Sequence, residues 1–337
     1  MMKQKPLASL SLDLDNKWSY MKTHADPGWE SFPSYLDILV PRVLNFLEEH
    51  GLKITFFIVG QDAALEKNHA AIRSIAEAGH EIGTHSFNHE PWLHLYTEQQ
   101  VEDDLTRAEE HIKRVTGQTP IGFRGPGYSF SSTVLRVLVQ HGYQYDASTL
   151  PTFLGPLARA YYFMTTKLSP EERESRKLLY GKLQDGLQPI HPYRWQIDGV
   201  EEKLVEIPVT TMPFFRIPFH VSYILFISRF SPVLARLYFR FALGLCKLAR
   251  ITPSLLLHPL DFLGCDDISE LAFFPAMDLT SKQKIKLVGE VLDIYSEYFT
   301  VVPLQKHARN FLQEKNLLKS KSKFRAIGHE PTTKNVL

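Results

Sequence analysis

The sequence predicts an α/β fold built on a parallel sheet, and three observations support this class. Short apolar runs typical of strands alternate along the chain with longer runs of helical periodicity. Polar side chains stand directly after five of the strand-like runs, where α/β enzymes carry their chemistry. The chain has 337 residues, of which 44% are hydrophobic, and this is enough for one barrel-sized domain or two smaller ones.

The first strand is expected in the run LASLSLDLD, where leucines alternate with polar residues. This period of two places Asp13 and Asp15 on the same side of the strand, at its C-terminal end. Two carboxylates there resist burial unless a cation or a basic group compensates them. One interpretation is a strand that runs out into a solvated loop. The other is that one carboxylate binds a metal while the second acts as a general base.

Helical and strand-like runs then follow in alternation. In chain order they are helix PSYLDILVPRVLNFLEEHG, strand KITFFIVG, helix DAALEKNHAAIRSIAEAGH, strand HEIG and helix TEQQVEDDLTRAEEHIKRVTG. This order favours parallel strands that are connected by helices.

The stretch GTHSFNHE comes directly after the strand HEIG and places His85 and His89 four residues apart. We expect the two imidazoles on one side of a helical turn, close enough to bind one metal ion. Such a pair is a weak signal by itself, because the chain contains 14 histidines. The carboxylates after the first strand supply the ligand type that the pair lacks.

Three further polar residues follow strand-like runs. Arg124 stands in IGFRGPGYSFS, where Gly-Pro-Gly makes a tight turn that lets backbone approach a ligand, ahead of the helical run SSTVLRVLVQHG. Asp146 ends GYQYDAS, and His258 follows the apolar run PSLLL. Each has a structural interpretation, such as a surface arginine or a structural histidine. Five such positions after five strand-like runs argue instead for one shared site.

The ordered set of motifs resembles the polysaccharide deacetylases, carbohydrate esterase family 4, from about Leu7 to about Pro303. The resemblance implies a deformed (β/α) barrel with seven or eight strands. It also implies a divalent metal, often zinc although other transition metals are known, and hydrolysis of an N-acyl or sometimes O-acyl group from a sugar. The motifs are Asp13 with Asp15, His85-x-x-x-His89, Arg124-x-Pro126, Asp146 and Leu255-x-x-His258.

The resemblance also implies a role for each residue. Asp13 matches the general base, Arg124 the group that orients it, and His258 the general acid. Asp146 matches the acid that tunes the His258 end of the site. The matching metal ligands are Asp15, His85 and His89.

Two departures from the family pattern bear on this transfer. Leu14 separates aspartates that are adjacent in the common pattern, as in a branch with allantoinase-like and some peptidoglycan deacetylase-like members. Gly127 stands where the third motif usually carries an aromatic residue. We expect the N–H of Gly127 still to face the oxyanion and Tyr128 to replace the aromatic wall. The same ligand trio occurs in non-haem iron oxygenases, but the ordered Arg and His motifs favour a hydrolase.

The segment 212–251 has an unusual charge distribution, since no acidic residue occurs between Glu206 and Asp261. A helix is expected after Ser231-Pro232, with a basic stripe on one face and leucines and Phe241 on another. It is either an ordinary barrel helix with a solvated basic face or an interfacial helix that rests on anionic lipid. Its arginines interrupt any transmembrane span. The basic stripe consists of Arg236, Arg240, Lys247 and Arg250.

We expect a single domain over residues 1–310, with insertions at about 150–200 and 212–251 and an unstructured basic tail over 315–337. Two cysteines cannot define a disulfide scaffold and suit a reducing compartment. The N-terminal residues MMKQKP run straight into a strand, so we expect no signal peptide and a cytoplasmic protein. The net charge of +1 and the lack of a nucleic-acid motif argue against a nucleic-acid partner.

Three functions are consistent with these features. The first is a metal-dependent hydrolase that removes an acetyl or formyl group from a sugar or glycan precursor, including one linked to a lipid at the inner membrane face. The second is an allantoinase-like amidohydrolase of small molecules, which would not need the basic segment. The third is a sugar-binding relative without turnover. Asp13, Arg124 and His258 argue against the third, because a binding protein needs neither a base nor an acid.

Overall fold

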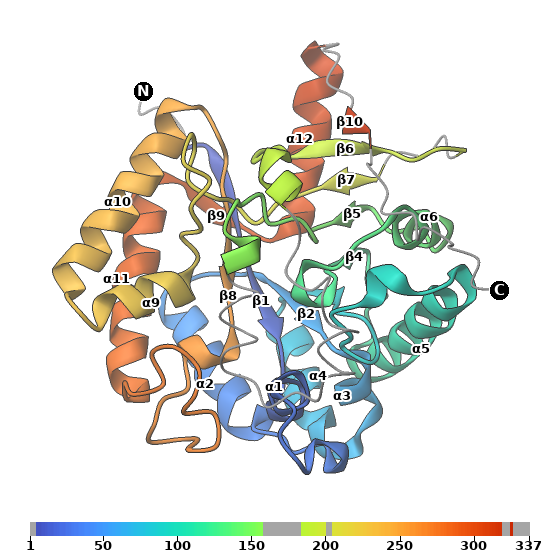
Figure 1. Cartoon of the computed structure of the whole chain (residues 1–337), viewed down its shortest axis with the longest axis horizontal. Helices are drawn as coiled ribbons and strands as arrows, with labels where there is room; N and C mark the ends of the chain where they lie inside the picture. The colour runs from blue at the N-terminus through green and yellow to red at the C-terminus, as the bar shows by residue number, and fades with distance from the viewer. Residues whose placement is uncertain (1–4, 158–182, 200–203, 319–323, 326–337) are drawn as a thin grey trace.

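The computed structural model describes residues 5–157, 183–199, 204–318 and 324–325, and in them a curled sheet is surrounded by helices (Figure 1). Seven parallel strands follow one another around the curl in the order β7-β5-β4-β3-β2-β1-β8. They are β1 (Leu7–Leu14), β2 (Thr55–Ile58), β3 (Glu81–Thr84), β4 (Gly122–Phe123), β5 (Tyr145–Asp146), β7 (Val205–Glu206) and β8 (Ser254–Leu257).

The curl closes between the chain that leaves β7 and strand β8. The N–H of Thr210 donates to the carbonyl of Ser254 at 3.0 Å, and the N–H of Ser254 donates to Thr210 Oγ1 at 2.8 Å. Only side-chain and loop contacts complete the ring here, so the barrel is deformed rather than regular. The expected deformed (β/α) barrel is therefore confirmed.

Three more strands extend the sheet beyond this ring. β6 (Tyr193–Gln196) pairs antiparallel with β7, and β10 (Phe324–Arg325) pairs with β6. β9 (Thr300–Val302) pairs with the beginning of β1. The sequence did not predict β6, because its single buried pair, Tyr193 and Trp195, is too short to stand out from an irregular segment.

The helices cover the outside of the curl (Figure 1). The α-helices are α1 (Lys17–His24), α2 (Leu36–Glu49), α3 (Gly60–Ala64), α4 (His69–Glu77), α5 (Glu98–Thr116), α6 (Ser132–Gln140), α9 (Val221–Ser228), α10 (Pro232–Leu248), α11 (Ser281–Tyr298) and α12 (Leu304–Leu318). The 3-10 turns are η1 (Trp29–Ser31), η2 (Glu66–Asn68), η3 (Leu93–Leu95), η4 (Pro126–Tyr128), η5 (Leu183–Leu187) and η6 (Pro259–Asp261).

Helix α5 illustrates how local sequence determines these elements. Thr97 and Gln100 form a reciprocal capping box at its start, and Gly117 ends it in the left-handed conformation. Apolar residues recur on its inner face at steps of three and four, so the helix packs against the barrel along one stripe. That stripe consists of Val101, Leu105, Ala108, Ile112 and Val115.

One expected helix is interrupted. The run DAALEKNHAAIRSIAEAGH forms α3, η2 and α4 instead of a single helix, because Leu65 takes an extended conformation (φ −94°, ψ 117°). The side chain of Asn68 donates to the backbone carbonyl and the carboxylate of Asp62, and this competes with helical hydrogen bonds. The break is useful to the site, because it directs Asp62 inward toward the segment after β1.

Parts of the expected domain plan fall on residues outside the description. The insertion expected at 150–200 includes 158–182 and residue 200, and the tail expected over 315–337 includes 319–323 and 326–337. The start of that tail continues α12 as far as Leu318. The boundary at about residue 310 and the unstructured tail therefore stay predictions.

Helix α11 supports the segment after β8 through a buried lysine. The ammonium group of Lys284 donates to the carbonyl oxygens of Leu260 and Leu263 at 2.7 and 2.8 Å. Burial lowers the pKa of Lys284 to about 8, although nearby carboxylates, Asp261 foremost, oppose this shift. Burial of the Lys284 ammonium group is therefore unfavourable by itself, but its hydrogen bonds anchor the segment after β8.

Lys284 should make stability depend on pH between about 8 and 10.5. In this range the unfolded chain binds the proton that the folded chain has released, so the free energy of unfolding should rise with pH, by on the order of 3 kcal/mol in total. Urea unfolding from pH 7 to 10.5 should show this rise in the parent protein and lose it in Lys284→Met. Lys282→Met, an exposed neighbour on α11, should keep it; equal slopes in all three proteins would contradict the assignment.

Candidate metal centre

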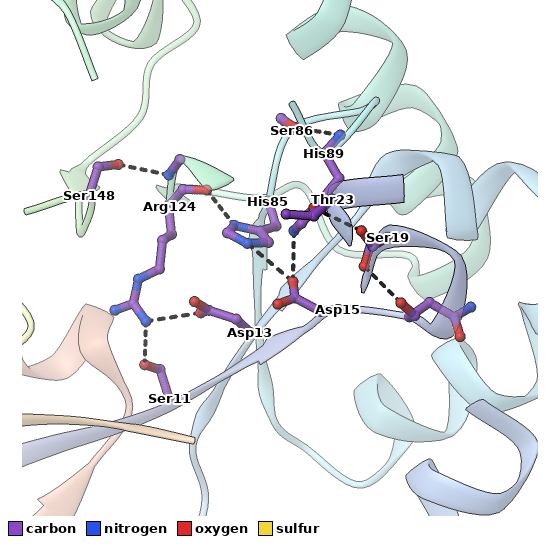
Figure 2. A network of polar contacts seen from close by, with 12 residues as sticks. Ser11, Asp13, Asp15, Ser19, Thr23, His85, Ser86, His89, Arg124 and Ser148 are labelled. Atoms are coloured by element: carbon purple, nitrogen blue, oxygen red, sulfur yellow. Dashed lines mark hydrogen bonds and ion pairs between the residues drawn. The ribbon is translucent and has the colours of Figure 1, made fainter. Parts of the chain in front are cut away.

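Three buried side chains converge at the C-terminal edge of the sheet. Asp15 follows β1, while His85 and His89 lie in the loop after β3. Asp15 Oδ1 lies 2.9 Å from His89 Nε2 and 3.3 Å from His85 Nε2, and Figure 2 shows both rings pointing at this carboxylate. One ligand atom from each residue lies within 4.8 Å of the other two. The three residues predicted as ligands therefore form one group.

The loop that carries the histidines is not the helical turn that the spacing suggested, and that prediction is wrong. Ser86 and His89 take left-handed conformations with φ of 59° and 52°. The carboxylate of Asp104 on α5 accepts the N–H groups of Phe87 and Asn88 at 2.7 and 3.2 Å. These bonds replace helical ones, and strained backbone of this kind is common at functional sites. The rings still meet, with centroids 5.1 Å apart.

The orientation of His85 suits metal binding. Its Nδ1 lies 2.6 Å from the carbonyl oxygen of Arg124. A carbonyl only accepts hydrogen bonds, so Nδ1 carries a proton, and Nε2 is the nitrogen that faces Asp15 and would present its lone pair to a bound metal. Two such nitrogens and one carboxylate oxygen match a zinc-type donor set and leave coordination positions open. The residues present therefore fit a divalent metal.

The electrostatics of the group keep its carboxylate ionised. Burial by itself would favour the neutral acid of Asp15, but the charge of His89 and hydrogen bonds from both histidines outweigh burial and lower its pKa. Asp15 is thus an anion in a nearly dry position, and it needs a cationic partner. A divalent metal held by the same three residues would meet this need.

The second aspartate of β1 faces a different partner. Arg124 Nη1 donates to Asp13 Oδ1 at 2.9 Å and to Ser11 Oγ at 3.1 Å, while its Nε donates to the carbonyl of Ala147 at 2.9 Å. The guanidinium is fully buried over the ring of Phe57, 4.6 Å from its centroid. Asp13 is held beside the metal group without belonging to it (Figure 2). This arrangement separates a carboxylate that could act as a base from one that could bind metal.

The turn after Arg124 requires glycine for steric reasons. A Cβ at Gly125 would stand 1.9 Å from the carbonyl oxygen of Ser129. Gly127 has φ of 58°, and a Cβ there would meet Pro91 at 3.0 Å, so the family's aromatic residue would not fit without displacement. Tyr128 donates its N–H to Gly125 within the turn, whereas Gly127 is exposed. The oxyanion role of Gly127 stays a prediction.

Tyr128 lies near the proposed base. Its side chain is half-buried, and burial, followed by the negative charge of Asp13, raises its pKa. Tyr20 on α1 and Tyr223 on α9 also face this region, as the interaction of Tyr20 with Asp15 and of Tyr223 with Tyr128 indicates. Tyr20 and Tyr128 thus lie near the carboxylates of Asp13 and Asp15, and Tyr223 lies near Tyr128. Tyr128 was expected to replace the missing aromatic wall, and Tyr20 and Tyr223 were not expected.

Asp146 lies behind Arg124 in a second acidic pair. It accepts a hydrogen bond from Ser148, and it neighbours Glu206 on β7. Burial, and then the charge of Asp146, raise the pKa of Glu206 far above its usual range, so Glu206 holds a proton. The sequence missed Glu206, because only the tertiary fold brings β7 beside β5.

His258 has its own group of partners. Ser222 Oγ donates to Asp261 Oδ1 at 2.8 Å and lies 3.3 Å from His258 Nδ1. Asp261 Oδ2 also accepts the N–H of His258 at 2.8 Å. The ring of His220 lies 5.5 Å away, and burial, followed by the charges of His258 and Arg124, lowers the pKa of His220 far below 6.5. His220 is therefore neutral.

Asp146 and His258 have different hydrogen-bond partners, and the role expected for Asp146 stays a prediction. The hydrogen bonds described for Asp146 lie along β5 and β7, whereas those of His258 go to α9 and η6. The carboxylate that contacts the His258 group is Asp261 rather than Asp146. The spacing His-Pro-Leu-Asp, a capping box at η6, could have revealed Asp261 from the sequence. Nothing local could have revealed Ser222.

Comparison with known proteins agrees with this site. Residues 26–145 match the family model described as polysaccharide deacetylase, in line with the resemblance that the motifs carry. A peptidoglycan deacetylase of Helicobacter pylori is 31% identical over 173 residues, which cover 51% of this chain and 53% of that protein. A peptidoglycan-N-acetylmuramic acid deacetylase of Bacillus subtilis is 35% identical over 105 residues, 31% of this chain and 39% of that protein. The aligned regions thus span about half or less of each relative.

A solved structure resembles the chain over nearly its whole length. A Mycobacterium smegmatis protein, provisionally named a polysaccharide deacetylase, superposes with a TM-score of 0.61 at 21% identity and covers 98% of this chain and 96% of its own. At this identity the likeness concerns the fold alone. It extends the likeness of fold beyond residues 26–145 to β8.

Replacing a ligand should remove the metal and leave the fold intact. His85→Ala and Asp15→Asn should each lower bound metal at least tenfold, because each deletes one of three protein ligands. Elemental analysis of protein purified with added zinc measures this directly, and circular dichroism checks folding. His111→Ala, a half-buried histidine on α5, is the matched control; stoichiometric metal in both ligand variants would refute the centre.

Proposed function

We propose that this protein is a metal-dependent hydrolase that removes an N-acetyl or N-formyl group from a sugar or glycan precursor. The observation that carries the proposal is the placement of two differently partnered aspartates beside one histidine pair. Asp15 lies within 3.3 Å of both imidazoles, and Asp13, two residues earlier, lies 2.9 Å from Arg124. Zinc is the metal that this donor set suits best.

A metal held by Asp15, His85 and His89 would polarise the acyl carbonyl and acidify a bound water. Asp13 is the group placed to accept the proton of that water. Its hydrogen bond from Arg124 holds the carboxylate in one orientation. The N–H of Gly127, if aimed at the developing oxyanion, would contribute about 3 kcal/mol.

His258 is the group we assign to protonate the departing amine. Ser222 donates its hydroxyl proton to Asp261, so its oxygen accepts from Nδ1–H of His258. This arrangement leaves Nε2 as the nitrogen available to the substrate. The proposed chain Asp261–Ser222–His258 thereby fixes the ring, and the carboxylate stabilises the imidazolium when it forms. Ser222 and Asp261 act as positioning residues.

The substrate class follows from the family and from the walls of the site. Tyr20, Tyr128 and Tyr223 combine an apolar ring with a hydroxyl, a composition suited to a sugar. The relatives' names point to peptidoglycan and its amino sugars. We propose an amino sugar within a glycan or a lipid-linked precursor, and a cytoplasmic place of action. Release of acetate or formate from such precursors tests this class. Hydrolysis of allantoin instead would favour the alternative function, a small-molecule amidohydrolase.

Asp13→Asn should separate catalysis from metal binding. The amide keeps the size of the side chain but cannot accept the proton, so kcat should fall by about 10²- to 10⁴-fold while bound metal stays near the parent level. Acetate release from an acetylated chito-oligosaccharide and elemental analysis on the same sample measure the two quantities. Metal loss equal to that of Asp15→Asn would show that both aspartates coordinate the metal. An unchanged kcat would show that another residue is the general base.

Asp261→Asn should lower turnover without altering metal content. The change removes the carboxylate that accepts the hydroxyl proton of Ser222, so the ring of His258 loses its fixed orientation, and kcat should fall while KM and bound metal stay near the parent values. Ser222→Ala should produce a smaller fall in kcat. Equal losses of kcat and of folded protein, followed by circular dichroism, would indicate a purely structural role, and Asp266→Asn, an exposed carboxylate in the same loop, is the control.

A further inference from the structure

Helices α9 and α10 expose a continuous apolar stripe. Ten of the fifteen exposed large hydrophobic side chains among the described residues lie between residues 214 and 248. Seven of them recur at helical spacing on α9, the following turn and α10, and each is between 41% and 75% exposed. This apolar stripe consists of Phe226, Phe230, Val233, Leu234, Leu237, Phe241 and Leu248.

The apolar stripe is not the face that packs on the barrel. α10 buries a different row, which includes Phe239 and Leu243, against the hydrophobic core. α9 and α10 form the outer layer at the left edge of the molecule, with α11 beside them (Figure 1). α10 is therefore apolar on two faces, one covered by protein and one open. Contiguous open apolar surface of this kind marks an interaction site.

The basic side chains of this segment lie beside the stripe and are mostly paired, contrary to the expectation of an unbalanced basic face. Arg236 and Arg240 bind Glu290 and Glu297 of α11 at 2.6 and 2.7 Å. Among the residues that the structure describes, no ion pair is formed by Lys247 or Arg250, and both are exposed. The outward surface thus combines apolar side chains with two cations and carries no carboxylate of its own.

This composition favours an anionic bilayer over a second protein chain. Phenylalanine and leucine on one face with lysine and arginine at its edge are typical of helices that lie in the membrane interface. Anionic headgroups complement Lys247 and Arg250, whereas a second copy of the chain would bring the same cations face to face. No described helix has the length and apolar content needed to cross a bilayer.

The stripe also continues from the candidate active site. α9 begins after His220, and Ser222 in its first turn contacts His258. Its eight residues span only about 12 Å before Phe226 and Phe230 reach the surface, where their rings pack edge to face at 5.7 Å. A bilayer seated on the stripe would therefore lie next to the mouth that His258 lines.

We propose that the apolar stripe of α9 and α10 docks this protein on anionic lipid, with α10 lying in the plane of the interface. Docking itself is independent of the proposed function. Its consequence for catalysis rests on that function: a sugar on a lipid carrier reaches the His258 side of the site while its tail stays in the bilayer.

Vesicle binding of the full chain tests the docking surface. The parent protein should sediment with phosphatidylcholine vesicles that contain phosphatidylglycerol. The triple variant Leu234→Gln/Leu237→Gln/Phe241→Gln should bind about tenfold or more weakly, because three apolar side chains no longer enter the interface. Lys247→Gln and Arg250→Gln should each weaken binding about fivefold, only on vesicles with anionic lipid. Ile38→Gln/Leu95→Gln changes equally exposed apolar residues elsewhere and should bind like the parent.

The outcomes distinguish the alternatives. A parent protein that ignores anionic vesicles at low salt, or a triple variant that binds equally well, overturns the proposal. If the parent instead forms dimers in sedimentation velocity that the triple variant loses, the stripe joins two copies. Asp13→Asn should bind vesicles normally, and the triple variant should hydrolyse a soluble acyl-sugar normally. Vesicle binding and hydrolysis therefore distinguish a failure of docking from a failure of the proposed chemistry.

Discussion

The buried guanidinium of Arg124 is the interaction on which the candidate site depends. Its side chain neutralises Asp13, and its backbone carbonyl fixes the ring of His85. The turn that begins after it brings Gly127 and Tyr128 to the mouth of the site. A fully buried guanidinium is tolerated only because carboxylates surround it. Arg124 thus contacts or precedes the proposed base, one metal ligand and the proposed oxyanion turn. A substitution of Arg124 would therefore affect all three.

The surroundings of Arg124 also explain why so many acids can be buried in one barrel. Asp15 is stabilised by the histidines, and Asp13 by Arg124. Behind them, Glu206 retains a proton beside Asp146, so that the second pair carries about one negative charge instead of two. Lys284 places a positive charge near Asp261. Each anion has a separate compensating group, which keeps the roles of neighbouring carboxylates distinct.

The helical layer beside β8 gives this barrel a feature that its catalytic residues do not require. α10 pairs its arginines with the acids of α11 and thereby turns its leucines and Phe241 outward. An ordinary barrel helix would bury one apolar row and expose charge. The same segment contains Ser222, which contacts His258. The outer surface and a partner of the proposed acid therefore belong to one continuous stretch of chain.

Much of the fold and of the site could be predicted from the sequence, because these features are local. The alternation in LASLSLDLD determines a strand and the side on which Asp13 and Asp15 stand, and the motif order predicts the barrel through its resemblance to the polysaccharide deacetylases. The tertiary structure decided the rest. It broke the helical turn expected at His85 through Asp104, placed Asp261 rather than Asp146 at His258, and paired Arg236 and Arg240 with a helix that begins 41 residues after Arg240. Periodicity and spacing report the conformation of a segment, whereas the partner of a buried charge depends on which distant segments the closed barrel brings beside it.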